Sequence, residues 1–137
     1  MAKQPHLLVE EGDVHEIAII PGDPGRVDRI ANLCDDSDLV AQNREYKIVN
    51  ASYEGTDLTI CSTGIGCPSA AIAVEELSRV GVETFLRCGT CGALQADMEV
   101  GDMVVATGAA KEEGTSKRYE SVEYPAVPDY DALTELV

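Results

Sequence analysis

Short apolar segments that end in glycine-bearing loops and lead into helices constrain this chain more than any other feature. Residues 16–20 (EIAII) form such a segment and end at Pro21-Gly22, after which Asp23 is placed to cap a helix with proline in its first position. Residues 68–81 (PSAAIAVEELSRVG) repeat the pattern with proline at the start and glycine at the stop. Alternation of strand and helix predicts an α/β domain with a mixed, largely parallel central sheet flanked by helices.

The other predicted elements are two helices and four strands. They are a helix from Pro24 to about Cys34, two strands within 44–64 joined at Glu54-Gly55-Thr56, strands at 83–89 and 101–110, and an amphipathic helix starting in 129–137. The last helix stops about two turns in, which is marginal for a free helix in water, so we interpret it as an element cut off midway.

Length and charge narrow the class of protein. The chain has 137 residues, so we expect one domain, spanning 1–137 and incomplete at its C-terminal side. A net charge of −15 with 45% hydrophobic residues fits a folded chain and argues against nucleic-acid or anionic-membrane binding. We find no apolar run of the ~20 residues a membrane span needs and no signal-peptide core, and we expect a cytoplasmic protein. The scattered acid excess predicts adaptation to a salty cytosol.

The five cysteines permit a metal or a redox interpretation. Cys61 and Cys67 are spaced too widely for the close-set pairs of structural zinc sites, and Cys88-x-x-Cys91 follows a predicted strand end rather than opening a helix. We therefore expect no metal site and treat the cysteines as small buried side chains.

Two arginines stand beside the predicted glycine loops. Arg26 lies in the first turn of a helix, against the positive end of the helix dipole, and Arg87 ends a buried strand just before Thr90. Both positions are unfavourable for a positive charge unless an anion lies beside it. An oxyanion, most simply phosphate, would supply that negative charge, and the carboxyl ends of parallel strands are where such ligands bind. The alternative is that the two arginines pair with carboxylates such as Asp23 or Glu75.

Two nucleotide-binding motifs fit less well. No Gly-Lys-Ser/Thr triplet of a P-loop occurs. Gly64-x-Gly66 resembles the start of a dinucleotide fingerprint, but Ser69 occupies the third glycine position, and Arg87 stands where an acid for the ribose belongs.

Four blocks, in the expected order, resemble one family. These are STGIGCPSAAIAVEEL (62–77), PGDPGRVDRIA (21–31), NREY (43–46) and FLRCGTCGALQ (85–95). They resemble the nucleoside phosphorylases that include uridine phosphorylase and hexameric purine nucleoside phosphorylase. The resemblance covers essentially the whole chain and implies a pentosyltransferase that splits a nucleoside with phosphate into free base and (deoxy)ribose 1-phosphate. It implies inorganic phosphate as co-substrate, no other cofactor, and homo-oligomers built from dimers, commonly hexamers.

The resemblance also implies roles for individual positions. Gly22, Arg26, Arg87 and Thr90 resemble the phosphate site, with Arg26, Arg87 and Thr90 as the catalytic group. Arg44 resembles the arginine lent to the same phosphate across the dimer interface, or is a surface charge. His6 resembles the histidine lent to the neighbour's ribose 5′-hydroxyl, or is a solvated terminal residue. Thr90, Cys91 and Gly92 resemble the residues beside ribose and base.

Substrate and completeness remain open within the resemblance. Thr90-Cys91-Gly92 is intermediate between the patterns of uridine phosphorylases and of hexameric purine nucleoside phosphorylases. Residues 113–131 look more like the uridine phosphorylases, so we favour uridine over a purine nucleoside. The family chain normally continues with a Glu-Met-Glu segment for the ribose hydroxyls, and no such triplet occurs here. We expect a phosphate half-site with little or no turnover from this chain alone. The alternative is a non-catalytic phosphate-binding or dimerising remnant.

Overall fold

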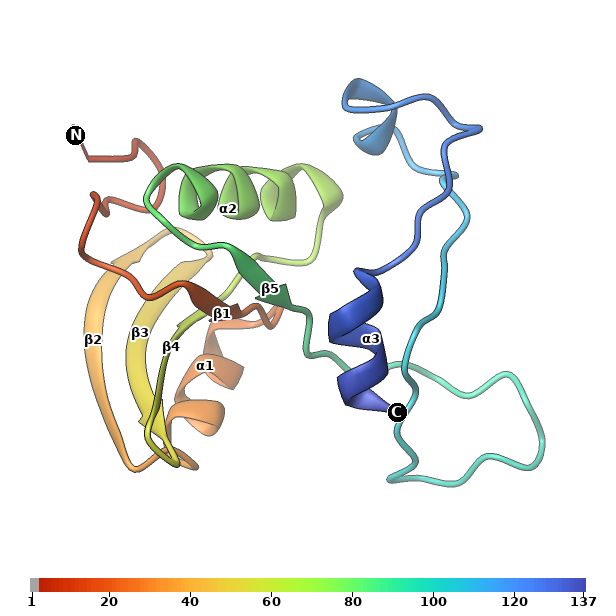
Figure 1. Ribbon diagram of the computed structural model, residues 1–137, viewed down its shortest axis with the longest axis horizontal. Coiled ribbons are helices and arrows are strands. Elements are labelled where there is room, and N and C mark those ends of the chain that lie inside the picture. The colour runs from red at the N-terminus through yellow and green to blue at the C-terminus, as the bar shows by residue number, and fades with distance from the viewer. Residues whose placement is uncertain (1–2) are drawn as a thin grey trace. The chain divides into compact units, whose positions relative to one another are not determined.

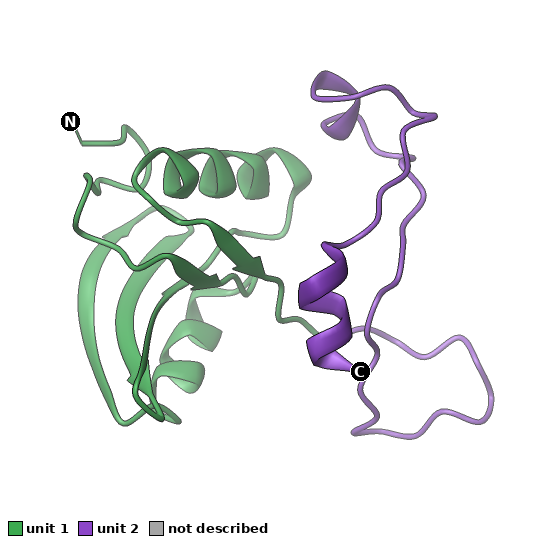
Figure 2. Cartoon of the chain, in the orientation of Figure 1, with its two compact units in different colours: residues 1–90 green, residues 91–137 purple. Residues whose placement is uncertain are grey.

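The computed structural model describes residues 3–137, which divide into two compact units. The first unit ends at Thr90 and the second covers 91–137 (Figure 2).

The first unit is an α/β layer arrangement (Figure 1). Its elements are β1 (Ile17–Ile19), α1 (Pro24–Ala31), β2 (Asp36–Asn43), β3 (Tyr46–Tyr53), β4 (Thr56–Cys61), α2 (Cys67–Arg79) and β5 (Thr84–Leu86). The predicted strands at 16–20, within 44–64 and at 83–89 are confirmed, as are both helices. The first helix ends earlier than expected, at Ala31, with Asn32 as its C-cap.

The sheet has the strand order β2-β3-β4-β1-β5. β1 pairs in parallel with β4 and with β5, whereas β3 is antiparallel to both β2 and β4. The mixed sheet is therefore confirmed, with its parallel strands grouped at the β5 side. β2 was not expected. Its first half is acidic and exposed, so its sequence lacks the apolar alternation of a half-buried strand.

Two hydrophobic clusters cover the two faces of this sheet. Ile48 of β3 belongs to one cluster, with Leu77 of α2, and the next residue, Val49, belongs to the other, with Val27 of α1. Because successive strand residues point to opposite faces, α1 and α2 cover opposite sides of the sheet. This packing fixes the strand ends from which the loops leave.

The second unit has little regular structure. It contains a 3₁₀ turn at Ser116–Arg118, a helix α3 at Tyr130–Leu136 capped by the Asp129 side chain, and an isolated bridge between Ala109 and Ala126. The start of a helix in 129–137 is confirmed. The strand predicted at 101–110 is wrong: apart from that bridge, the segment has no partner strand among the described residues, and an extended segment needs one to pair its backbone groups. Among the described residues, no helix is long and apolar enough to cross a membrane.

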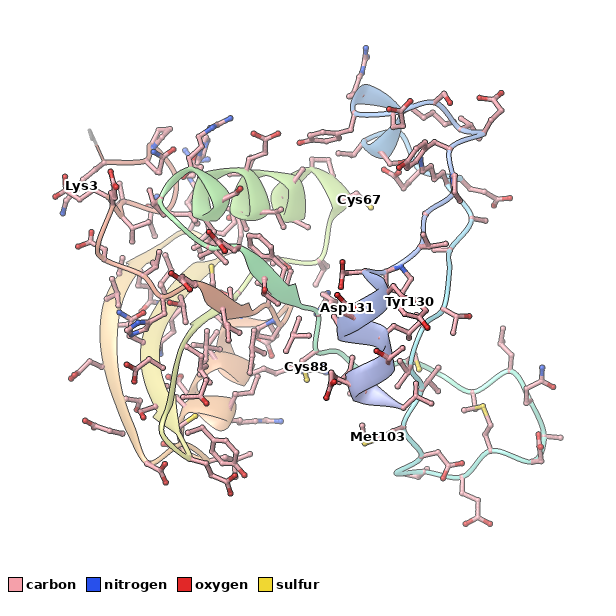
Figure 3. The ribbon with its side chains drawn as sticks, in the orientation of Figure 1. Lys3, Cys67, Cys88, Met103, Tyr130 and Asp131 are labelled. Carbon is pink, nitrogen blue, oxygen red and sulfur yellow. The ribbon has the colours of Figure 1, made fainter. Side chains whose placement is uncertain are left out.

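The cysteines do not match the expectation that they are buried. Only Cys61 is buried, Cys34 is partly buried, and the remaining three are exposed. Figure 3 shows two of these three, Cys67 at the start of α2 and Cys88 beyond the end of β5. Both lie outside the apolar segments that pack against the sheet, which is why small size did not lead to burial.

Candidate functional site: the loops at the carboxyl ends of β1, β4 and β5

Three loops meet at one edge of the sheet because their strands are parallel neighbours. Thr63, which follows β4, donates its backbone N–H to the carbonyl of Pro21 at 2.9 Å. Ile20, at the end of β1, donates to the carbonyl of Leu86 in β5, also at 2.9 Å. These bonds hold the three loops in register at the edge where α/β proteins collect their ligands.

Gly22 lies where an added side chain would be crowded. A Cβ placed there would stand 3.2 Å from the carbonyl oxygen of Gly64 and 3.3 Å from Nη2 of Arg87. The backbone of the first loop therefore approaches both the second loop and the arginine that follows β5. An added methyl group would be crowded there, and one of these neighbours would have to move by a few tenths of an ångström.

The two arginines reach this edge without a carboxylate partner. Arg87 donates from Nη1 to the carbonyls of Ile20 at 3.0 Å and Cys88 at 2.8 Å. Arg26 donates from Nη2 to the hydroxyl of Thr90 at 2.8 Å. Within residues 3–137 neither arginine takes part in an ion pair. Carbonyl and hydroxyl partners orient a guanidinium but do not neutralise it, so both positive charges are available to an anion.

The carboxylates considered as partners for these arginines are engaged elsewhere. Asp23 accepts the N–H of Gly25 and caps α1. Glu75 pairs with Arg79 one helical turn on, at 2.6 Å. The ion-pair alternative for Arg26 and Arg87 is therefore not observed.

A shallow pocket of ≈ 440 Å³ adjoins the loops on the side of the β2–β3 turn. Gly22 and Gly64 line it together with Glu45 and Ser69, and neither arginine does.

The Cys61 thiol is fully buried, and this burial raises its pKa to about 12, so it is not a nucleophile at neutral pH.

Comparison with known proteins places the chain in a family. The sequence profile of the Phosphorylase superfamily matches residues 16–137. The chain belongs to the phosphorylase superfamily.

Relatives within this superfamily carry two different substrate names. The chain is 98% identical over 137 residues to a guanosine phosphorylase of Halorubrum lacusprofundi, covering 100% of this chain and 57% of the relative. It is 45% identical over 134 residues to a uridine phosphorylase of Thermococcus kodakarensis, covering 98% of this chain and 48% of the relative. The chain thus spans about half the length of the curated relatives it matches.

Solved structures of superfamily members share the fold. A uridine phosphorylase from Vibrio fischeri superposes with a TM-score of 0.95 at 48% identity, covering 99% of this chain and 57% of that one. A purine nucleoside phosphorylase from Toxoplasma gondii, in complex with immucillin-H, also gives 0.95, at 36% identity and with 99% and 55% covered. The α/β fold expected from the sequence is confirmed.

Of the phosphorylase-like positions, the structure brings Gly22 beside Arg87 and joins Arg26 to Thr90. Arg44 lies exposed in the two-residue turn between β2 and β3, with φ +54° and no hydrogen bond or ion pair within the described part of the chain. Cys91 and Gly92 are exposed in the second unit.

His6 is not a solvated terminal residue. Its Nδ1 lies 2.5 Å from Oε1 of Glu76, a buried carboxylate on α2. Sequence reasoning missed Glu76, although a signal was present. Glu76 falls three residues after Ala73 and directly before Leu77, which places an acid on the buried face of the helix.

Proposed function

We propose that the protein to which this chain belongs is a nucleoside phosphorylase and that this chain supplies its phosphate-binding part. A phosphate oxygen forms a bond to C1′ of the nucleoside while the glycosidic C–N bond breaks. The electron pair of that bond leaves with the base, the proton of hydrogen phosphate ends on the base, and the products are free base and (deoxy)ribose 1-phosphate. The observation that carries the proposal concerns Arg26 and Arg87, which lie at the glycine loops and form no ion pair with a carboxylate within residues 3–137.

The proposed roles follow from the charge that develops during this reaction. Breaking the bond builds positive charge on the sugar, and a phosphate dianion held in line stabilises it. Arg26 and Arg87 position that phosphate electrostatically, Thr90 adds a hydroxyl, and bare backbone at Gly22 lets the anion come close. The scheme needs no enzyme nucleophile and no cofactor besides phosphate itself.

We also propose that two residues act on a neighbouring copy of the chain in a dimer-based oligomer. Arg44 carries a positive charge that no described carboxylate neutralises, on a turn whose left-handed backbone a non-glycine residue adopts at a cost of about 1–3 kcal/mol. Strain of this kind clusters at functional positions, which supports a role for Arg44 at the partner's phosphate. His6 is proposed for the partner's ribose 5′-hydroxyl, and Thr90, Cys91 and Gly92 for the ribose and base of their own site.

For the nucleoside substrate, we propose guanosine as the first candidate to test and uridine as the second. The name of the 98% identical relative supports guanosine. The names of the relatives at about 45% identity, such as that of Thermococcus kodakarensis, support uridine, which the sequence pattern also favours.

The test separates phosphate binding from catalysis. Phosphate should raise the Tm of the chain relative to chloride at equal ionic strength, because a ligand that binds only the folded state stabilises it by about 2.7 kcal/mol at a hundred times its Kd. Arg26→Gln should abolish this shift. Arg29→Gln, which removes a charge from the last turn of the same helix, should leave it intact.

Release of guanine and uracil from guanosine and uridine is then measured with and without phosphate. The buffer contains molar KCl, because the net charge of −15 favours folding in high salt. Phosphate-dependent release supports the phosphorylase and identifies the base. Stabilisation without release supports the phosphate-binding part proposed for this chain, with catalysis absent from the chain alone. A Tm that phosphate does not change, or an equal shift in Arg26→Gln, contradicts the phosphate site.

A further inference from the structure

A buried carboxylate holds the N-terminal segment of the first unit. Glu76 on α2 is 3% exposed, and its Oε2 accepts the backbone N–H of His6 at 3.1 Å and of Leu7 at 2.8 Å. Its Oε1 lies 2.5 Å from Nδ1 of the His6 ring. Three groups of His6 and Leu7 therefore contact the same carboxylate. Glu76, which carries it, lies 70 positions after His6 in the chain.

The His6 backbone is fixed from a second side. Asn43, the last residue of β2, donates its side-chain amide to the carbonyl of His6 at 2.8 Å. The Leu7 side chain is fully buried in the cluster beneath α2. With its backbone held by α2, β2 and the core, the His6 ring has few orientations left.

The chemistry of Glu76 selects one form of that ring. An ionised carboxylate only accepts hydrogen bonds, so the Nδ1 atom facing it carries the proton. Within residues 3–137 no lysine or arginine pairs with Glu76, and a buried charge without such partners depends on its hydrogen bonds. Nε2 is then the ring nitrogen left for other contacts, on a side chain that is 36% exposed.

We propose that Glu76 is a positioning residue that holds Nδ1–H of His6 inward and presents Nε2 to a ligand hydroxyl. The inference deepens the proposed function and rests on it for the identity of that hydroxyl, the ribose 5′-hydroxyl of a nucleoside bound by a neighbouring copy. A carboxylate that only stapled the backbone would need the two N–H groups and not the ring.

The ring itself provides the test. The chain has two histidines, so ¹⁵N-imidazole NMR resolves His6 from His15, whose ring makes no hydrogen bond among the described groups. We expect a protonated Nδ1 on His6, with a proton that exchanges with water more slowly than any ring proton of His15. A His6 ring with its Nδ1 unprotonated would overturn the proposal, and this measurement needs no substitution.

Matched variants test the cause. Glu76→Gln keeps the volume and an oxygen for the backbone N–H groups but removes the charge, so we expect loss of the slowly exchanging Nδ1 proton. Glu75→Gln, on the same helix and paired only with Arg79, should leave the His6 signals unchanged. Unchanged His6 signals in Glu76→Gln would contradict the proposal. If that variant fails to fold, the wild-type tautomer decides.

The two proposals fail separately. The phosphate-induced rise in Tm reports on Arg26 and is independent of the His6 ring. A phosphate shift with an unprotonated Nδ1 would overturn only the role of Glu76. A protonated Nδ1 without a phosphate shift would leave Glu76 in place and overturn the phosphate site.

Discussion

The two units of this chain differ in how their apolar residues are used. In the first unit a five-stranded sheet is covered on both faces, and two clusters of buried side chains form. In 91–137 no residue is buried, although the segment contains Leu94, Val100, Met103 and Tyr130, all of them exposed. The difference shows that an apolar pattern specifies which face of a segment can be buried. The segment forms regular structure only where another element packs against that face.

The same division runs through the proposed site. The residues proposed to bind phosphate, Gly22, Arg26, Arg87 and Thr90, lie in the first unit, where sheet pairing and helix packing determine their loops. The residues proposed for the base, Cys91 and Gly92, begin the second unit. Under the proposal, the residues for phosphate are held by the packed first unit, whereas two of the residues for the base lie in a segment without a buried side chain.

A matched pair of leucines gives the largest expected difference between the units. Leu77→Ala removes a side chain that is 0% exposed between α2 and the sheet, and it should lower the free energy of unfolding by about 2–5 kcal/mol. Leu94→Ala makes the same chemical change at a residue that is 99% exposed and should stay within about 0.5 kcal/mol. Urea denaturation followed by circular dichroism measures both. Similar losses from the two variants would show that 91–137 contributes to a common core.

The fold of the first unit was largely predictable because its signals are local. Apolar runs bounded by proline and glycine indicated β1, β3, β4 and both helices. β2 was missed because an edge strand paired on one side needs little apolar sequence and takes its order from β3. The strand expected at 101–110 did not form for the opposite reason, since its apolar sequence finds no partner strand within residues 3–137 beyond the bridge at Ala109.

The site was predictable where a rule of chain geometry applied. Parallel strands bring their carboxyl ends to one edge, which was enough to expect that the loop after β5 lies beside the loop and helix after β1, as the Arg26–Thr90 hydrogen bond shows. No such rule relates His6 to Glu76. Their contact joins the N-terminal segment to a helix 70 residues later and depends on how α2 lies over the sheet.

Cysteine alkylation compares how accessible side chains are in the two units. Burial raises the pKa of the Cys61 thiol to about 12, so at pH 8 it holds on the order of a thousandfold less thiolate than a free cysteine of pKa about 8.5. Cys91 in the second unit is exposed. Brief iodoacetamide treatment followed by mass spectrometry should label Cys91 and spare Cys61, and urea should remove the difference. Early labelling of Cys61 in the native chain would mean that the core of the first unit opens readily.

The smallest expected effect concerns a turn of the second unit that is held by hydrogen bonds between residues close in the chain. Hydrogen bonds from the side chain and backbone of Ser116, together with the N–H of Thr115, lower the pKa of the Glu113 carboxyl from 4.5 to about 2. Because the folded-state pKa is depressed, the stabilisation of this turn is complete above pH 4.5 and is lost as the pH falls through about 2. The amide resonances of Thr115 and Ser116 should therefore shift with a midpoint near pH 2.

Glu113→Gln should remove that titration, while Glu112→Gln at the neighbouring position should leave it in place. All the bonds concerned lie within four residues, so the midpoint should also persist in Leu77→Ala, where the core of the first unit is weakened. A midpoint near 4.5 in that variant would tie the turn to the core. Order in 91–137 would then be borrowed from the first unit rather than local, and the contrast between the two units would be one of degree.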